Sequence, residues 1–163
     1  HDRYVVARHT AYLEPVYEDS CVEAFLQPKP DRGYFNFEIN CTGALLSSYI
    51  TDARRKPGGG FEAFEPLPWE IARNVALETS MKGPVRHEIE EAIVWTAAFR
   101  IPFSLFESYT GPLEWPRHAT WRANFYKCAD RSTHPHWAAW ADIGESLNFH
   151  QPDRFRELCL ETA

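Results

Sequence analysis

The chain has 163 residues, a formal net charge of −6 and an aromatic content of 15%. Its negative charge disfavours nucleic acid and anionic membranes as partners, because both repel an acidic surface. The sequence contains no apolar run long enough to span a bilayer and no N-terminal signal segment, so no membrane span is expected.

Short apolar runs separated by Gly and Pro predict an all-β chain. Residues 29–33 are expected to form the turn of a hairpin and the Gly/Pro-rich residues 54–70 a loop. Residues 71–81 contain good helix formers, but their alternation at period two favours a strand. This spacing of strands predicts a sandwich or a barrel. The expected strands cover residues 3–13, 19–26, 34–41, 43–53, 71–81, 90–103, 119–129 and a last stretch through Leu158 and Leu160.

The predicted hairpin has two unlike faces. Apolar and polar side chains alternate along both arms, which places one set on a buried face and the other set on the opposite face. The second face collects Glu23, Asn36, Glu38 and Asn40. It is either a solvated surface or the floor of a binding site.

The four cysteines, at positions 21, 41, 128 and 159, follow no metal-ligand spacing. Cys21 and Cys41 lie on the two arms of the hairpin, which suggests a disulfide. Their parity places them on opposite faces, so a bridge between them requires a β-bulge that reverses the parity. The redox compartment stays open.

His134, His136 and His150 suggest a metal site. The first two are two residues apart, so they would share a face of a strand, and Asp130 or Asp142 can add a carboxylate. Pro135 between them and the absence of a further ligand motif argue against this hypothesis.

Five segments resemble, in the right order, the family 9 carbohydrate-binding modules and their relatives. The resemblance extends from about residue 3 to the C-terminus and rests on VYEDSCVEAF, YFNFEIN, IVWTAAFRIPF, WRANFY and WADIGESLNFHQPDRFRELCLE. It implies a jelly-roll-like antiparallel β-sandwich that binds a sugar end between two aromatic rings. Polar side chains address the sugar hydroxyls in such modules.

The resemblance also assigns residues to the sugar site. Tyr17, six positions before Glu23, matches the first ring, and Phe149 matches the second. The best-known members carry Trp at both positions, so this chain has a smaller ring twice. Asn40 is retained, but Glu38 stands where the family has Arg, which puts the original sugar specificity in doubt.

Glu23 and Glu38 can each hydrogen-bond adjacent sugar hydroxyls. Two carboxylates on neighbouring strands also repel, which raises the pKa of one unless a donor intervenes. Candidate donors are Lys127, Arg122 and Asn124. Further aromatic candidates are Trp121, Trp137 and Trp140, although core packing is the expected role of each.

The resemblance favours non-catalytic binding of a mono- or oligosaccharide. One alternative is glycosidase chemistry by Glu23 and Glu38, since the two carboxyl groups of retaining enzymes lie about 5–5.5 Å apart. Another is a haem-binding sandwich that uses Met81, beside Lys82 and close to His87.

No cofactor is expected with certainty; the resemblance allows a structural Ca²⁺ near Asp19 and the loop carboxylates, without a definite ligand set. It favours an extracellular or periplasmic location. Residues 1–163 are expected to form a single carbohydrate-binding-like domain. Family modules carry further strands ahead of the aligned region, so this chain is expected to lack them, to replace them, or to be part of a larger carbohydrate-active protein.

Overall fold

The structure is a computed structural model that describes residues 1–113 and 120–161. Within these residues the strands are β1 (Val5–Ala7), β2 (Cys21–Gln27), β3 (Tyr34–Asn40), β4 (Leu45–Arg55), β5 (Phe61–Pro66), β6 (Ala76–Thr79), β7 (Val85–Ile89), β8 (Ala97–Arg100), β9 (Thr120–Cys128), β10 (Trp137–Ala139) and β11 (Arg156–Cys159). The helical elements are η1 (Val16–Glu18), α1 (Trp69–Ala72), α2 (Phe103–Thr110) and η2 (Pro152–Arg154).

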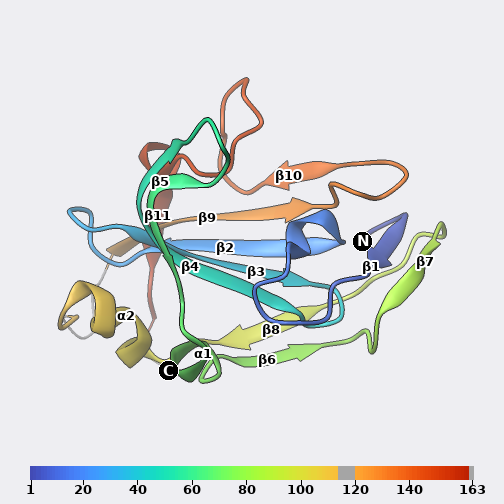
Figure 1. Ribbon diagram of the computed structural model, residues 1–163, viewed down its shortest axis with the longest axis horizontal. Helices are drawn as coiled ribbons and strands as arrows, with labels where there is room; N and C mark the ends of the chain where they lie inside the picture. Colours follow the sequence, from blue (N-terminus) through green and yellow to red (C-terminus); the bar gives the residue numbers. More distant parts are fainter. Residues whose placement is uncertain (114–119, 162–163) are drawn as a thin grey trace.

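A seven-stranded antiparallel sheet forms the main layer, with strand order β10-β9-β2-β3-β4-β5 (Figure 1). β11 pairs with the first half of β9 and β10 with the second half, so both lie along the same edge. Two smaller antiparallel pairs, β6–β8 and β1–β7, complete the β-structure of the described residues.

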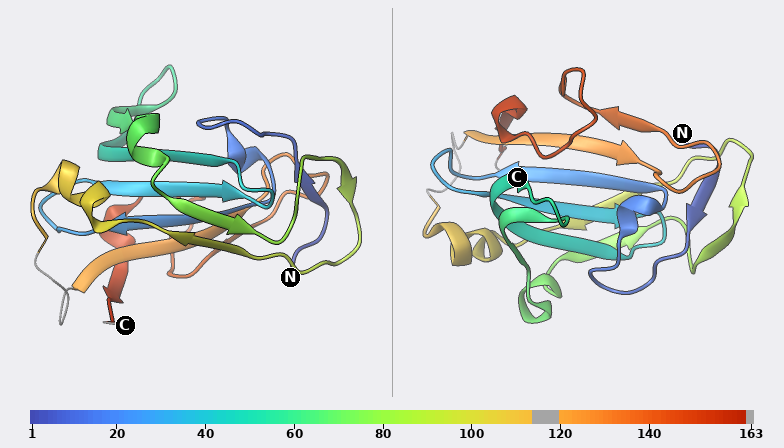
Figure 2. Two further views of the ribbon diagram at one scale, coloured as in Figure 1. Left: turned by 90° about the horizontal axis from the view of Figure 1, so that it is seen from below. Right: turned by 45° about the horizontal axis from the view of Figure 1, so that its top comes forward.

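The β6–β8 pair and both α-helices cover one face of the main sheet, as the left view of Figure 2 shows. Phe35, Phe37 and Ile39 of β3 are fully buried on this face. They pack in one apolar cluster with Leu77 of β6 and Phe99 of β8. The predicted antiparallel β-sandwich is therefore confirmed.

The other face of the main sheet is also covered. Every residue of β3 is buried, including Asn36, Glu38 and Asn40. The covering segments are η1 with the loop before it, the β4–β5 hairpin and the segment after β10 (Figure 2, right). The polar face is therefore not a solvated surface, and its side chains lie in an environment of low dielectric constant.

The predicted hairpin is confirmed, and β2 and β3 match its two arms to within two residues. Glu23 is opposite Glu38, and the two strands pair from Cys21 to Leu26. Gly33 closes the turn at a place where only glycine fits, because a Cβ atom there would lie 2.3 Å from the carbonyl oxygen of Ile50.

Other element predictions need correction. The strand expected over 3–13 is limited to β1, because the backbone that follows binds side-chain carboxylates instead of a neighbouring strand. The expected loop 54–70 contains β5, which pairs with β4. Residues 71–81 form a strand only in β6, after the short helix α1. The strand expected over 90–103 is limited to β8.

The strands β7 and β10 and the helix α2 were also not expected from the sequence. α2 begins directly after Pro102, a residue that suits a helix N-terminus as well as a strand end. β9 confirms the strand predicted over 119–129, although residue 119 lies outside the described residues. The last strand, β11, begins at Arg156, two residues before the predicted stretch.

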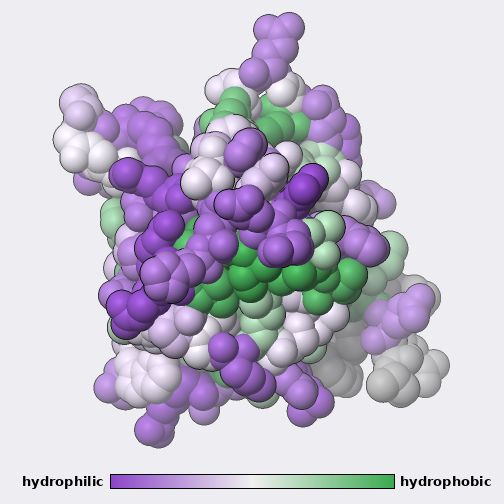
Figure 3. Space-filling view, turned by 90° about the vertical axis from the view of Figure 1, so that its right-hand side faces the viewer, coloured by the Kyte–Doolittle hydropathy of each residue, from purple (hydrophilic) through white to green (hydrophobic). Residues whose placement is uncertain are grey.

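All four cysteines are free, and Cys21 and Cys41 lie on opposite sides of the main sheet as their parity predicts. Cys41 packs with Val5 and Ala7 in an apolar cluster at the end where β1 and β7 lie. Seen from that end, apolar residues form a central strip between hydrophilic margins (Figure 3). Within the described residues, no helix has the length and apolarity needed to cross a membrane.

Candidate functional site

The polar face of the main sheet is the floor of a pocket of about 510 Å³. Glu23 of β2, Asn36 and Glu38 of β3, Ser48 of β4 and Cys128 of β9 form this floor. The walls come from Leu13, Tyr17, Arg55, Phe61, Phe64, Asp130, Trp137, Leu147, Phe149 and His150, among others. Four neighbouring strands of the main sheet and the segments that cover them therefore meet at one cavity.

Two buried carboxyl groups lie side by side on the pocket floor. Glu23 and Glu38 occupy directly opposed positions and are only 5% and 4% exposed. Glu38 Oε1 accepts a hydrogen bond of 2.7 Å from Asn36 Nδ2. Glu38 Oε2 is buried and has no hydrogen-bond partner among the residues that the structure describes. This oxygen is free to accept a hydrogen bond from a bound molecule.

The environment shifts the titration of both groups. Burial raises the pKa of Glu38 to about 7, although the hydrogen bond from Asn36 acts in the opposite direction. Burial and the neighbouring Glu38 raise the pKa of Glu23 well above its usual value. Burial is the larger cause at both groups, and the repulsion expected between paired carboxyl groups adds to it at Glu23. At neutral pH the pair carries less than two negative charges, so it can donate as well as accept hydrogen bonds.

Aromatic rings form much of the pocket wall. Tyr17 is 40% exposed and lines the pocket, as does Phe149, which stacks on Tyr126 with ring centroids 4.1 Å apart. The structure thus brings the two rings assigned by the resemblance to the same cavity. Trp137 lines it too and is 44% exposed, and its Nε1 donates to Asp130 Oδ1 at 2.7 Å.

The other two tryptophan candidates lie elsewhere. Trp121 is buried and packs edge-on against Phe106 in the core. Trp140 is exposed and packs on Phe125, which belongs to the opposite side of the sheet. The expectation of core packing therefore holds for Trp121 and not for Trp137 or Trp140.

Arg55 contributes a positive charge to the pocket wall, and the sequence did not indicate it as a site residue. Its guanidinium lies 4.3 Å from the centroid of the Phe61 ring, a cation–π contact. Its charge also lowers the pKa of Glu38. Two register shifts in the β4–β5 pairing, on either side of Asp52, break the alternation along β4. The side of the sheet on which Arg55 lies could therefore not be predicted by counting residues from the start of β4.

None of the three expected donors lines the pocket. Lys127 faces the other side of the sheet, where its Nζ lies 3.2 Å from Asp2 Oδ2. Arg122 donates to the main-chain carbonyl groups of Asp153 and Phe155. Asn124 donates to the carbonyl of Ala141. Each of these side chains holds a neighbouring segment in place.

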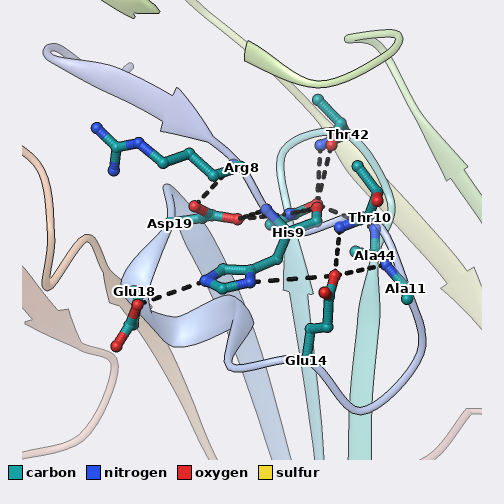
Figure 4. A network of polar contacts seen from close by, with 10 residues as sticks. Arg8, His9, Thr10, Ala11, Glu14, Glu18, Asp19, Thr42 and Ala44 are labelled. Carbon is teal, nitrogen blue, oxygen red and sulfur yellow. Dashed lines mark hydrogen bonds and ion pairs between the residues drawn. The ribbon is translucent and has the colours of Figure 1, made fainter. Parts of the chain in front are cut away.

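Asn40 does not line the pocket; its side chain hydrogen-bonds His9, Asp19, Thr42 and Ala44, residues that Figure 4 labels. Its Nδ2 donates to Asp19 Oδ2 at 2.8 Å and to the carbonyl of His9 at 2.9 Å. Its Oδ1 accepts from the main-chain N–H groups of Thr42 and Ala44. Asn40 therefore connects the β3–β4 turn to the loop that precedes η1.

Asp19 completes this connection. Its two carboxylate oxygens accept hydrogen bonds from the main-chain N–H groups of Arg8 and His9, at 2.9 and 3.0 Å (Figure 4). Asp19 Oδ2 also accepts the hydrogen bond from Asn40 Nδ2. The role of Asp19 is to hold residues 8–19, the loop that carries Leu13 and Tyr17.

Further contacts fix this loop over the pocket. The carbonyl of Tyr17 accepts a hydrogen bond of 3.3 Å from the N–H of Asp130, and that of Glu18 accepts one of 2.9 Å from Arg131. Leu13 has a left-handed backbone with φ of 66°, held by its N–H bond to the carbonyl of Leu45. Such a conformation costs about 1 kcal/mol or more in a non-glycine residue, so the surrounding contacts must maintain it.

The histidine metal hypothesis receives no support from the geometry. The ring of His134 stacks on Tyr4, with centroids 3.8 Å apart. His136 Nε2 instead contacts Asp2 Oδ1 and Lys127 Nζ, at 3.0 and 3.1 Å. A cation such as Lys127 next to the ring nitrogen opposes the binding of a metal ion there.

The haem hypothesis is not supported either. Met81 packs in the apolar cluster of Cys41 and β1. Lys82 Nζ donates to the carbonyl of Thr79 at 3.0 Å. His87 is exposed on β7. None of the three side chains lines the pocket described above.

Replacing Asn40 by alanine should destabilise the fold. The side chain is fully buried and makes hydrogen bonds with both of its polar atoms. Asn40→Ala leaves several buried partners unsatisfied and should lower the free energy of unfolding by about 3 kcal/mol, measured by urea denaturation. The matched control is Asn74→Ala, whose side chain is exposed and which should cost under about 1 kcal/mol. Equal losses in the two variants would contradict the assigned role.

His150 should make stability depend on pH. Burial, followed by the charge of Arg55, lowers its pKa from 6.5 to about 3. Between these values the unfolded chain binds a proton that the folded chain does not, so the contribution of His150 is present above pH 6.5 and is lost as the pH falls. Between pH 7 and pH 5 this loss should be about 2 kcal/mol.

The measurement is urea denaturation of wild type and His150→Gln at both pH values. The variant should lose less stability than wild type over this interval. His87→Gln, at an exposed histidine, serves as the control and should behave as wild type does. An unchanged pH dependence in His150→Gln would show that another group is responsible.

Comparison with known proteins agrees with the resemblance. Residues 1–160 match the model of the family described as carbohydrate-binding family 9. A crystal structure of a candidate carbohydrate-binding protein from Bacteroides uniformis ATCC 8492 superimposes with a TM-score of 0.83 and 32% sequence identity, over 96% of this chain and 68% of that one. A search of curated protein sequences found no match. By the extent of the family match, this chain belongs to carbohydrate-binding family 9.

Proposed function

We propose that the pocket binds the end of a mono- or oligosaccharide without catalysis. Tyr17 and Phe149 would contact the apolar C–H faces of the sugar, and Glu23 and Glu38 would hydrogen-bond its hydroxyl groups. Trp137, a further aromatic candidate from the sequence, would add a third ring to the site. The family to which the chain belongs supports sugar as the ligand class.

One observation carries this proposal. Glu38 Oε2 is a buried acceptor with no protein partner in the described residues, on the floor of a pocket walled by exposed aromatic rings. A sugar combines hydroxyl donors with apolar C–H faces, so it can satisfy the oxygen and cover the rings at once. A purely apolar ligand would leave the acceptor unsatisfied.

Asn40 takes an indirect part in the proposed site. Its polar atoms are engaged by the loop and the turn, so it would position Tyr17 rather than contact the sugar. Arg55 would restore a positive charge near position 38, where family members carry Arg and this chain carries Glu. The guanidinium group belongs to β4 instead of β3. Its N–H donors would therefore reach the sugar from another direction, which would change the sugar that is preferred.

The extent of the binding unit is also a proposal. We take residues 1–163 as one sugar-binding domain that serves a larger carbohydrate-active protein. The family match over residues 1–160 supports a single unit of this length.

Isothermal titration calorimetry against a panel of mono- and oligosaccharides tests the proposed site. Tyr17→Ala, Glu23→Ala and Trp137→Ala should each weaken binding about tenfold or more, because each removes a ring contact or a hydrogen bond of about 1–3 kcal/mol. Trp140→Ala is the matched control: Trp140 is also exposed but lies outside the pocket, so binding should be unchanged. A folded wild type that binds no sugar would refute the proposal, as would equal losses in Trp137→Ala and Trp140→Ala.

A second assay separates binding from hydrolysis. Incubation of the chain with the oligosaccharide that binds best should leave it intact, as measured by reducing-end release. Glycosidase chemistry requires carboxyl groups on opposite sides of the scissile bond, whereas Glu23 and Glu38 both lie on the pocket floor. Hydrolysis by wild type that disappears in Glu23→Gln would establish the catalytic alternative instead.

A further inference from the structure

Two thiols and one carboxyl group meet on the polar face of the main sheet, where Glu23 and Cys128 line the pocket and Cys21 lies beside them. Cys21 and Cys128 are directly opposed on β2 and β9, and Glu23 is the next residue of β2 on the same face. One ligand atom from each, the two Sγ atoms and a carboxylate oxygen, all lie within 4.8 Å of one another. The three side chains are 0%, 1% and 5% exposed.

The separation of these atoms is close to what one metal ion requires. Bonds of about 2.3 Å to sulfur and about 2.0 Å to oxygen, at tetrahedral angles, place two sulfur ligands about 3.8 Å apart and sulfur about 3.5 Å from oxygen. Cys128 Sγ now lies 3.0 Å from Glu23 Oε1 as a hydrogen-bond donor. This pair would open by about half an ångström, a shift that small χ rotations provide.

We propose that Cys21, Glu23 and Cys128 form a binding site for a thiophilic divalent metal ion, with Zn²⁺ as its best occupant. Two thiolates and a carboxylate suit zinc, whereas Ca²⁺ and Mg²⁺ prefer ligands that are all oxygen. The ligands stand on paired strands in the middle of the main sheet, so the backbone holds them in place before a metal arrives.

The fourth coordination position faces the pocket, because Glu23 and Cys128 both line it. Glu38 lies opposite Glu23 and lines the same pocket, with its buried Oε2 unpartnered in the described part of the chain. A water molecule on the metal would donate to this oxygen. Outer contacts of this kind orient the ligands of zinc sites.

Metal binding should displace protons. Cys128 carries a thiol hydrogen, which it donates to Glu23 Oε1. Zinc binds thiolates, so both thiol protons leave when it binds, and the affinity should rise with pH.

Titration of the reduced, metal-free chain with Co²⁺, a spectroscopic substitute for Zn²⁺, tests the proposal. One equivalent should produce the thiolate-to-cobalt charge-transfer band and the visible bands of a tetrahedral ion, and Zn²⁺ should displace the cobalt and abolish both. Cys21→Ser and Cys128→Ser should weaken Zn²⁺ binding about 100-fold or more, because serine keeps the shape but is a poor zinc ligand. Glu23→Gln should weaken it less.

Cys159→Ser is the matched control, because Cys159 is free and exposed and lies outside the cluster. It should bind Zn²⁺ as wild type does, and circular dichroism should show that all variants are folded. The proposal is overturned if the folded wild type gives no charge-transfer band, or if Cys128→Ser retains full affinity. A Cys21–Cys128 disulfide in the purified protein, with no metal uptake after its reduction, would overturn it as well.

Discussion

The pairing of β2 with β3 is the constraint on which the pocket depends. Its register places Glu23 opposite Glu38 on one face and leaves Phe37 and Ile39 on the other. A slip of β3 by one residue would move Glu38 into the apolar core and bring Phe37 onto the pocket floor. The fully buried apolar side chains therefore hold the register, and the register in turn fixes the carboxyl pair.

The same polar face anchors the segments that cover it. Tyr126 donates its hydroxyl hydrogen to the carbonyl of Phe149 at 2.8 Å, and the hydroxyl of Tyr34 lies 2.7 Å from His150 Nδ1. On the other side, Asn40 binds the loop that carries Tyr17. These two wall segments come from distant parts of the sequence, but each is attached to the main sheet by a polar side-chain contact. The wall positions are thus set by the sheet and not by the loops alone.

The sequence was informative wherever the chain alternates regularly. Period-two alternation was enough to place Glu23 and Glu38 on one face, and the resemblance brought Tyr17 and Phe149 to the same cavity. Alternation fails at the register shifts of β4, so the sequence could not predict on which side of the sheet Arg55 lies. Trp137 reaches the pocket through the turn between β9 and β10, whose path depends on contacts with η1. Contacts between distant segments leave no periodic signal in the sequence.

Glu23 belongs both to the carboxyl pair and to the thiol cluster, so the two proposed sites are coupled. A buried acceptor without a partner, such as Glu38 Oε2, costs the empty protein about 1–3 kcal/mol, which a donor from a sugar or from a metal-bound water would recover. A metal ion that takes the Glu23 carboxylate removes it from the hydrogen bonds available to a sugar. Because linkage is reciprocal, sugar and metal must change each other's affinity by the same factor. The sign of that factor depends on whether a sugar hydroxyl can replace the water at the open position.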